Sequence, residues 1–241
     1  GEFNLPGKIL NIPEIKELVN QQINKPQIEL SIQKNIQSKE IKNLVSQKVK
    51  IQYEKNPYPR WEKIALKTTP EIPVKHFNNL NLNFSGELIN DWDNINVLVA
   101  GCGTGQHAIA TASKYKKSFI TAIDLSINSL SYAKRKADEL EIKNIEFVQM
   151  DILNLKSINK KFNIIESIGV LHHMDNPFEG WKILNDNLEN GGMMMIGLYS
   201  NIAREHIVKI RNDIKSKNFN FDKKNIIKFR EKIISSNNLD Y

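Results

Sequence analysis

The sequence has a single cysteine, Cys102, among its 241 residues. One thiol cannot build an internal disulfide framework or a zinc site made of several cysteines. Long apolar runs are missing as well, because the longest, at 96–100 and 193–198, fall far short of the roughly 20 residues that a membrane-spanning helix needs. These absences favour a cytoplasmic protein without a membrane span.

Acidic residues are outnumbered. Lysine and arginine number 34 against 27 aspartate and glutamate residues, which gives a formal net charge of +7. A basic excess is compatible with a nucleic-acid partner. The lysines are dispersed along the whole chain, however, so the charge supports such a partner only weakly, and RNA stays an open alternative.

The hydrophobic content of 40% is enough for one α/β core with an extension. In residues 9–55 apolar positions recur at helical spacing, which predicts two or three amphipathic helices broken near Pro13 and Pro26. The segment "KNPYPRW" (55–61) cannot continue a helix and predicts an ordered loop. We therefore expect three regions: a helical extension ending in a loop (1–61), a core domain (62–200), and C-terminal helices that lead into a missing or separate region (201–241).

From residue 95 on, short apolar runs alternate with helical patterns. The apolar runs predict strands at 96–100, 118–123, 145–149, 162–167 and 193–198. The intervening segments predict helices at 106–114, 128–140 and 177–188, with a turn at Gly191-Gly192 and two later helices at 202–217 and 223–235. Near-continuous apolar strands joined by crossover helices indicate a Rossmann-like, doubly wound parallel sheet of the α/β class.

A glycine-rich turn follows the first of these strands in "VLVAGCGTGQHAIATA". Gly101, Gly103 and Gly105 allow a sharp turn and the close approach of a ligand to a helix N-terminus. The dinucleotide fingerprint requires a glycine where Gln106 stands, and the Gly-Lys-Ser/Thr of a phosphate-binding P-loop is absent. The spacing favours a nucleoside ligand without a pyrophosphate, with S-adenosylmethionine the foremost candidate.

Two carboxylates follow the next two strands. Asp124 in "FITAIDLS" stands where it can accept hydrogen bonds from both ribose hydroxyls, since Ser126 can cap the next helix in its place. Asp151 in "FVQMDIL" can accept from the adenine amino group, with Ile152 packing on the ring. The alternatives are a helix cap for Asp124 and a solvated loop position for Asp151.

These motifs, together with "FNIIESIGVLHHM" and "NGGMMMIGLYS", resemble those of class I S-adenosylmethionine-dependent methyltransferases over residues 95–200. With "QYEKNPYPRW" added, the chain resembles a bacterial subfamily often fused to tetratricopeptide repeats, and it is broadly similar to rickettsial protein lysine methyltransferases. The resemblance implies a seven-stranded sheet, of which this chain lacks the last two strands. An open sheet edge would remain. We therefore expect a fragment of a longer protein, with an upstream repeat domain or a downstream region, or a second chain over that edge, as in a homodimer.

The resemblance also implies a set of cofactor contacts. They are Tyr53, Tyr58, Arg60, Ala100, Gly101, Cys102, Gly103, Gly105, Asp124, Leu125, Asp151, Ile152, Ser167, Ile168 and Gly169. Tyr53, Tyr58, Arg60 and Trp61 could close over the cofactor as a lid, with Arg60 on its carboxylate. Alternatively, Tyr58 and Trp61 merely pin the helical extension to the sheet. The chain departs from the family pattern at Val99, where many members carry an acid that anchors the methionine end, and at Asn163, where an aspartate is frequent.

The acceptor side of the site is less defined. We place Trp61, His172 and Tyr199 there, with His172 and His173 as weak catalytic candidates whose alternative is helix capping or packing. Adjacent histidines without further ligands do not make a zinc site, and we expect no metal. The predicted function is S-adenosylmethionine-dependent methyl transfer, releasing S-adenosylhomocysteine, to an unidentified protein side chain such as lysine or to a small molecule. The alternatives are a cofactor-binding assembly or sensing module with little catalysis and an RNA methyltransferase.

Overall fold

The structure is a computed structural model that describes residues 12–80, 82, 92, 94–216 and 222–235. The chain divides into two compact units, Gly1–Gly197 and Leu198–Tyr241. The first unit holds the sheet and the motifs that the sequence singles out. The second contains two helices and is described separately.

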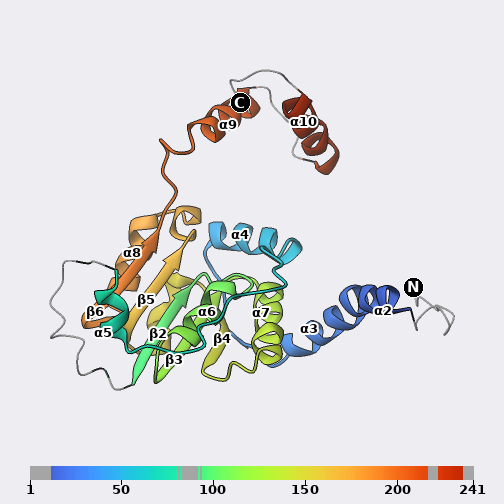
Figure 1. The fold of residues 1–241 in the computed structure, drawn as a ribbon. Coiled ribbons are helices and arrows are strands. Elements are labelled where there is room, and N and C mark those ends of the chain that lie inside the picture. The colour runs from blue at the N-terminus through green and yellow to red at the C-terminus, as the bar shows by residue number, and fades with distance from the viewer. Residues whose placement is uncertain (1–11, 81, 83–91, 93, 217–221, 236–241) are drawn as a thin grey trace. The chain divides into compact units, whose positions relative to one another are not determined.

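All strands of the first unit run parallel in one six-stranded sheet (Figure 1), in the order β1-β4-β3-β2-β5-β6. Their bounds are Gln37–Ser38 (β1), Ile95–Ala100 (β2), Ser118–Asp124 (β3), Ile145–Gln149 (β4), Phe162–Ile168 (β5) and Leu188–Gly197 (β6). The predicted doubly wound α/β class is confirmed. The order changes direction between β2 and β5, and in open parallel sheets ligands bind beyond the strand ends at such a point.

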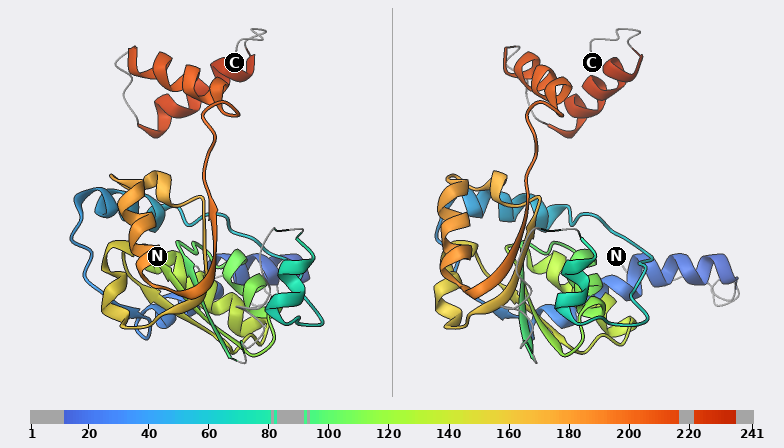
Figure 2. Two further views of the ribbon diagram at one scale, coloured as in Figure 1. Left: turned by 90° about the vertical axis from the view of Figure 1, so that its left-hand side faces the viewer. Right: turned by 60° about the vertical axis from the view of Figure 1, so that its left-hand side comes forward.

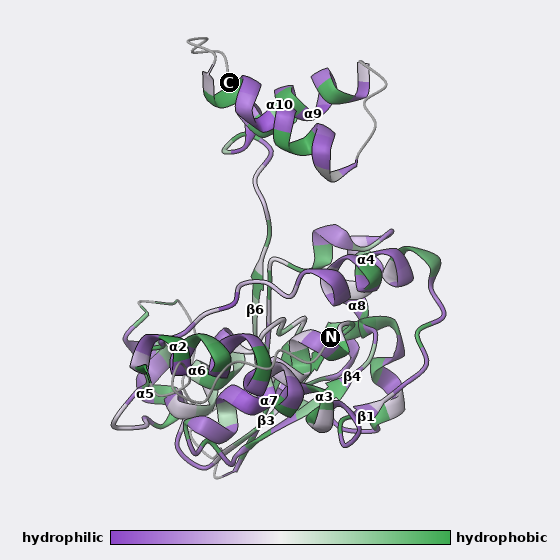
Figure 3. Ribbon diagram, turned by 90° about the vertical axis from the view of Figure 1, so that its right-hand side faces the viewer, coloured by the Kyte–Doolittle hydropathy of each residue, from purple (hydrophilic) through white to green (hydrophobic). Residues whose placement is uncertain are grey.

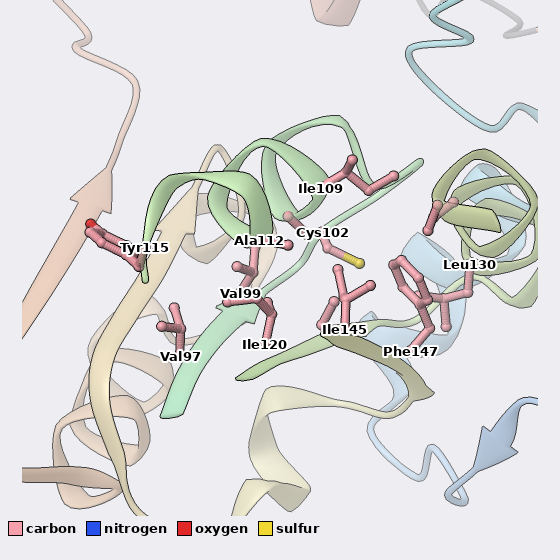
Figure 4. Packing of buried hydrophobic residues seen from close by; sticks show 14 of the residues in the cluster. Val97, Val99, Cys102, Ile109, Ala112, Tyr115, Ile120, Leu130, Ile145 and Phe147 are labelled. Atoms are coloured by element: carbon pink, nitrogen blue, oxygen red, sulfur yellow. The ribbon is translucent and has the colours of Figure 1, made fainter. Parts of the chain in front are cut away.

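Helices cover both faces of this sheet, as the edge-on view on the right of Figure 2 shows. One face carries α5 (Pro73–Asn78), α6 (Gln106–Lys114) and α7 (Ile127–Glu139), and the other carries α8 (Pro177–Asp186) with the short 3-10 helices η3 (Ile152–Ile158) and η4 (Leu171–His173). Side chains alternate between the faces along each strand, so Val97 and Val99 join the α6–α7 cluster (Figure 4) while Leu98 joins the α8 cluster.

The N-terminal extension differs from the prediction. Helix α2 (Pro13–Val19), the π-helix η1 (Asn20–Asn24) and α3 (Lys25–Gln33) follow one another without interruption. Pro13 begins α2, where a missing N–H costs little, and the residues before position 12 lie outside the described part of the chain. Near Pro26 the helical run changes from the π-helix η1 to α3 without being interrupted. Strand β1 was not predicted, since two residues are too short to show a strand pattern. Helix α4 (Leu44–Lys55) follows and ends at the first residue of the predicted loop.

The pair Gly191-Gly192 is not a turn before the last strand, as predicted, but lies inside β6. Phe162 pairs with Leu188 and Ile164 with Met193, so β6 bulges between these partners. Gly191, at a φ of 73°, accommodates the irregularity. Among the residues that the structure describes, β6 is the outermost strand on its side.

The second unit contains α9 (Glu205–Ser216) and α10 (Lys223–Ser235), which carry both hydrophobic and hydrophilic stretches (Figure 3). Residues 198–241 include ten lysines and arginines but only five aspartates and glutamates. The excess of basic over acidic residues is therefore largest in this unit, although lysines occur along the whole chain. None of the helices described is long and apolar enough to cross a membrane.

Candidate active site

The glycine turn between β2 and α6 is tied to the end of β3. The N–H groups of Gly101 and Cys102 donate to the carbonyl oxygen of Ile123 at 2.8 and 3.0 Å. Gly101, Gly103 and Gly105 all have positive φ, at 75°, 53° and 81°. A residue with a side chain would be strained at any of these positions, which explains why all three are glycine.

Asp124 stands at the end of β3, half-buried against this turn. Its carboxylate accepts from the N–H of Gly103 at 2.8 Å and from the N–H of Ser126 at 2.9 Å, while the Ser126 hydroxyl caps α7 by accepting from Ser129 N–H. Burial raises the pKa of Asp124, the two N–H groups lower it, and the charge of Glu54 raises it further. Each carboxylate oxygen keeps a second lone pair, so the side chain can also accept from ribose hydroxyls.

Asp151 stands at the end of the neighbouring strand β4. Its Oδ1 accepts from the N–H of Leu153 at 3.0 Å and so caps η3. The residue is only 3% exposed, and its Oδ2 has no hydrogen-bond partner among the residues that the structure describes. The alternative of a solvated loop aspartate is therefore wrong. A buried acceptor without a donor is costly, and the adenine amino group is a donor of the right kind.

The end of β5 supplies the segment Ser167–Gly169. Ser167 is buried, and within the described part of the chain its hydroxyl has no hydrogen-bond partner either. Ile168 is 48% exposed, and a Cβ added at Gly169 would meet nothing within 4 Å. A polar buried atom thus lies next to open space, as a ligand site requires.

The loop after α4 covers the glycine turn. The Thr104 hydroxyl donates to the carbonyl oxygen of Pro59 at 2.5 Å, and the Trp61 indole N–H donates to the carbonyl oxygen of Thr104 at 3.0 Å. A Cβ at Gly103 would lie 3.4 Å from the carbonyl oxygen of Tyr58. The loop is therefore held on the turn by its backbone.

Within this loop the side chains divide into two kinds. Trp61 is 6% exposed, its carbonyl accepts from the Tyr132 hydroxyl, and its ring lies against α7. Tyr58, in contrast, is 73% exposed, and the Arg60 guanidinium lies 5.8 Å from the centroid of the Tyr132 ring. Trp61 has the contacts of an anchor, whereas Tyr58 and Arg60 are exposed at the surface of the loop.

Glu54, near the end of α4, was missed by the sequence analysis. Its carboxylate accepts from the N–H groups of Ile127 and Asn128, both at 3.0 Å, and from the Ser126 hydroxyl at 3.3 Å. It thereby caps the N-terminus of α7, the helix that begins directly after Asp124. A cap supplied from so far along the chain leaves no local sequence signal.

Glu166, in the middle of the predicted fourth strand, was also missed. It is 2% exposed and stands beside Val99 in the register of β5 and β2. Burial alone would raise its pKa, but hydrogen bonding to His107 and the charge of Lys114 hold the pKa to about 2. Asn163 in the same strand accepts from the N–H of Asn96 at 2.8 Å, so its amide oxygen does what an aspartate could do there.

The remaining predicted residues fall in different places. His172 and His173 lie in η4 with ring centroids 4.3 Å apart, and Tyr53 of α4 is 6.2 Å from His173 in an edge-to-face arrangement. Ala100, Cys102 and Ile152 are buried, and Leu125 receives a hydrogen bond from Gln149. Tyr199 belongs to the second unit, where the Arg204 guanidinium lies 3.8 Å from its ring centroid.

A protein-family model described as "Methyltransferase domain" matches residues 91–238. The chain belongs to this methyltransferase family. Its cofactor is S-adenosylmethionine, and the buried acceptors of Asp151 and Ser167 beside the glycine turn fit such a ligand.

The chain is similar to two named methyltransferases and to an uncharacterised protein. (S)-Coclaurine N-methyltransferase of Papaver somniferum is 27% identical over 104 residues, covering 43% of this chain and 29% of the relative. Malonyl-(acyl-carrier protein) O-methyltransferase of Priestia megaterium is 28% identical over 124 residues, covering 52% and 42%. An uncharacterised protein of Synechococcus is 32% identical over 119 residues, covering 49% and 28%. The match therefore spans less than half of each relative.

Among solved structures, that of PKMT2 from Rickettsia typhi in complex with AdoHcy is similar. It shares 22% identity, with 59% of this chain and 29% of that chain covered and a TM-score of 0.46.

Proposed function

We propose that this chain transfers the methyl group of S-adenosylmethionine to a nucleophilic nitrogen or oxygen of a protein side chain, such as lysine, or of a small molecule. The observation that carries the proposal is the buried Oδ2 of Asp151, which no described residue contacts as a hydrogen-bond donor and which stands one strand from Asp124. Two carboxylates at the ends of adjacent strands can read a ribose and an adenine together. The named N- and O-methyltransferases among the relatives support an acceptor nitrogen or oxygen.

When bound, the cofactor supplies an electrophilic methyl group on a sulfonium sulfur. Asp124 accepts from the ribose hydroxyls, Asp151 accepts from the adenine amino group, and Ile152 packs on the ring. The Ser167–Gly169 segment and the glycine turn take the methionine end. These residues fix the direction of the methyl group, and alignment is the main requirement of an in-line displacement.

The loop residues Tyr58 and Arg60 complete the site by excluding water, with Arg60 on the methionine carboxylate. If the substrate nucleophile arrives protonated, His172 or His173 acts as the base that removes its proton. Both histidines sit in η4, two residues after Gly169.

The basic second unit favours RNA as the second candidate acceptor, because it carries most of the net positive charge. We further propose that the protein acts in the cytoplasm and that the natural chain includes repeats upstream or a further region downstream that covers the β6 edge. A homodimer over the β6 edge is the alternative to such a region.

Calorimetric titration with S-adenosylmethionine tests the proposal, with NAD titrated in parallel. We expect micromolar binding of the former alone, lost in Asp124→Ala and weakened about tenfold in Asp151→Asn, which removes one charged acceptor. The control is Asp138→Asn, at an exposed position of α7. Binding of NAD, or equal binding by Asp151→Asn, would contradict the proposal. Binding without methylation of lysine peptides, small amines or RNA would instead support a sensing module.

A further inference from the structure

A cluster of polar side chains around the buried Glu166 joins β5 to α6 and has no role in the function proposed so far. The Oε2 of Glu166 contacts the Nε2 of His107 at 2.6 Å and accepts from the Thr111 hydroxyl at 2.6 Å. The Oε1 accepts from the Lys114 ammonium at 3.3 Å. The carboxylate is 2% exposed, so these partners account for a charge that burial would otherwise penalise heavily.

The cluster lies beside the proposed place of the methionine end. Glu166 directly precedes the Ser167–Gly169 segment and is paired with Val99 of β2. Val99 stands two residues before Gly101, the first residue of the glycine turn. His107 is the second residue of α6, directly after the glycine turn. Every segment that we assign to the methionine end is thus within two residues of Glu166, Val99 or His107.

The chemistry of His107 follows from its partner. An ionised carboxylate accepts only, so the Nε2 of His107 must carry a proton and donate it. This contact occupies Nε2 and leaves Nδ1 as the ring nitrogen for a ligand, and the side chain keeps 36% of its surface exposed.

We propose that His107 recognises the amino-acid end of the cofactor's methionine moiety through Nδ1, and that Glu166 is a positioning residue that fixes the orientation of the ring. The proposal rests on the proposed function. It assigns the recognition of the amino-acid end to a side chain of α6, in a chain whose Val99 offers no polar group there.

Two ligands separate this role from a structural one. S-Adenosylhomocysteine contains the amino-acid end, whereas 5′-methylthioadenosine shares its nucleoside and thioether but lacks that end. In calorimetric titrations of the whole chain, we expect His107→Leu and Glu166→Gln to weaken S-adenosylhomocysteine about tenfold, as the loss of a hydrogen bond to a charged group does. The affinity for 5′-methylthioadenosine should stay within about twofold.

The matched controls are Thr111→Val, which removes another donor to the same carboxylate oxygen, and His206→Gln in α9. Both should keep the discrimination between the ligands. Equal weakening of both ligands in His107→Leu, or weakening of neither, overturns the inference and leaves the proposed function intact. If the unsubstituted chain binds neither ligand, the proposed function fails as well. If Glu166→Gln does not fold, His107→Leu decides.

Discussion

The indole N–H of Trp61 donates to the carbonyl oxygen of Thr104 at 3.0 Å, between a loop and a turn that lie far apart in the sequence. The hydroxyl of the same threonine donates back to the loop at Pro59. Loop and glycine turn therefore hold each other in place. A substitution of the buried Trp61 should therefore also alter the position of the glycine turn at the cofactor site.

Trp61→Phe should lower the free energy of unfolding by about 1–3 kcal/mol, because the buried carbonyl of Thr104 loses its donor. Urea denaturation measures the change. Trp181→Phe is the matched control, since Trp181 is 40% exposed on α8 and should change stability by less than about 0.5 kcal/mol. Equal effects of the two substitutions would show that the indole contact contributes nothing.

Glu54→Gln should destabilise the fold by about 1–2 kcal/mol, because α7 loses a negative charge at its N-terminus and a cap that accepts from two backbone N–H groups. The control is Glu40→Gln, whose side chain is 78% exposed. Thermal unfolding of the two variants side by side gives the comparison. A Glu54→Gln variant as stable as the control would remove the cap from our account of α7.

Cofactor affinity should fall on acidification at a higher pH than an ordinary aspartate would cause. Burial, the first cause, raises the pKa of Asp124 above its usual 3.8, and Glu54 raises it further. Below that pKa the neutral side chain loses an acceptor for the ribose hydroxyls. Titrations across pH measure the midpoint, which Glu54→Gln should move to lower pH and Asp124→Asn should abolish. A midpoint unmoved by Glu54→Gln would contradict the coupling of the two carboxylates.

The sequence was sufficient where local pattern decides the structure. Helix α6 and strand β4 begin and end at the predicted residues, because a glycine turn or a polar loop bounds each apolar run. Ser126 caps α7 as predicted, since the capping preference of serine is local.

Pairing between distant residues could not be predicted. Strand β1 forms only by pairing with β4, where Gln37 lies opposite Val148 and Ser38 opposite Gln149. A stretch of two residues is too short to predict such a pairing from the sequence. Glu54 and Glu166 look like ordinary polar positions in a helix and a strand. Their partners become visible only when α7 and α6 are folded against them.

Acid should destabilise the protein through Glu166. Its pKa is about 2 in the folded chain against an ordinary 4.5, so the unfolded chain takes up the proton first as pH falls. The stabilisation is complete above about pH 4.5 and is lost as pH falls towards 2, by up to about 3 kcal/mol. Urea denaturation across this range should show a shallower decline for Glu166→Gln. Parallel curves for the two proteins would mean that other carboxylates dominate.

Two glycines with similar positive φ angles should respond differently to alanine. Gly105 has a φ of 81°, and an added Cβ would lie 2.4 Å from the Cβ of Ala133, so turn and α7 would have to separate. We expect Gly105→Ala to lower the free energy of unfolding by more than about 3 kcal/mol, because strain and overpacking combine.

Gly169 has a φ of 75°, but an added Cβ would meet nothing within 4 Å. Gly169→Ala should therefore cost only the strain of about 1–2 kcal/mol, while its methyl group occupies space that we assign to the cofactor. In Gly169→Ala the loss of binding free energy for the cofactor should exceed the loss of unfolding free energy, when both are measured on the same preparation. The reverse order would place the cofactor's methionine end elsewhere than at the end of β5.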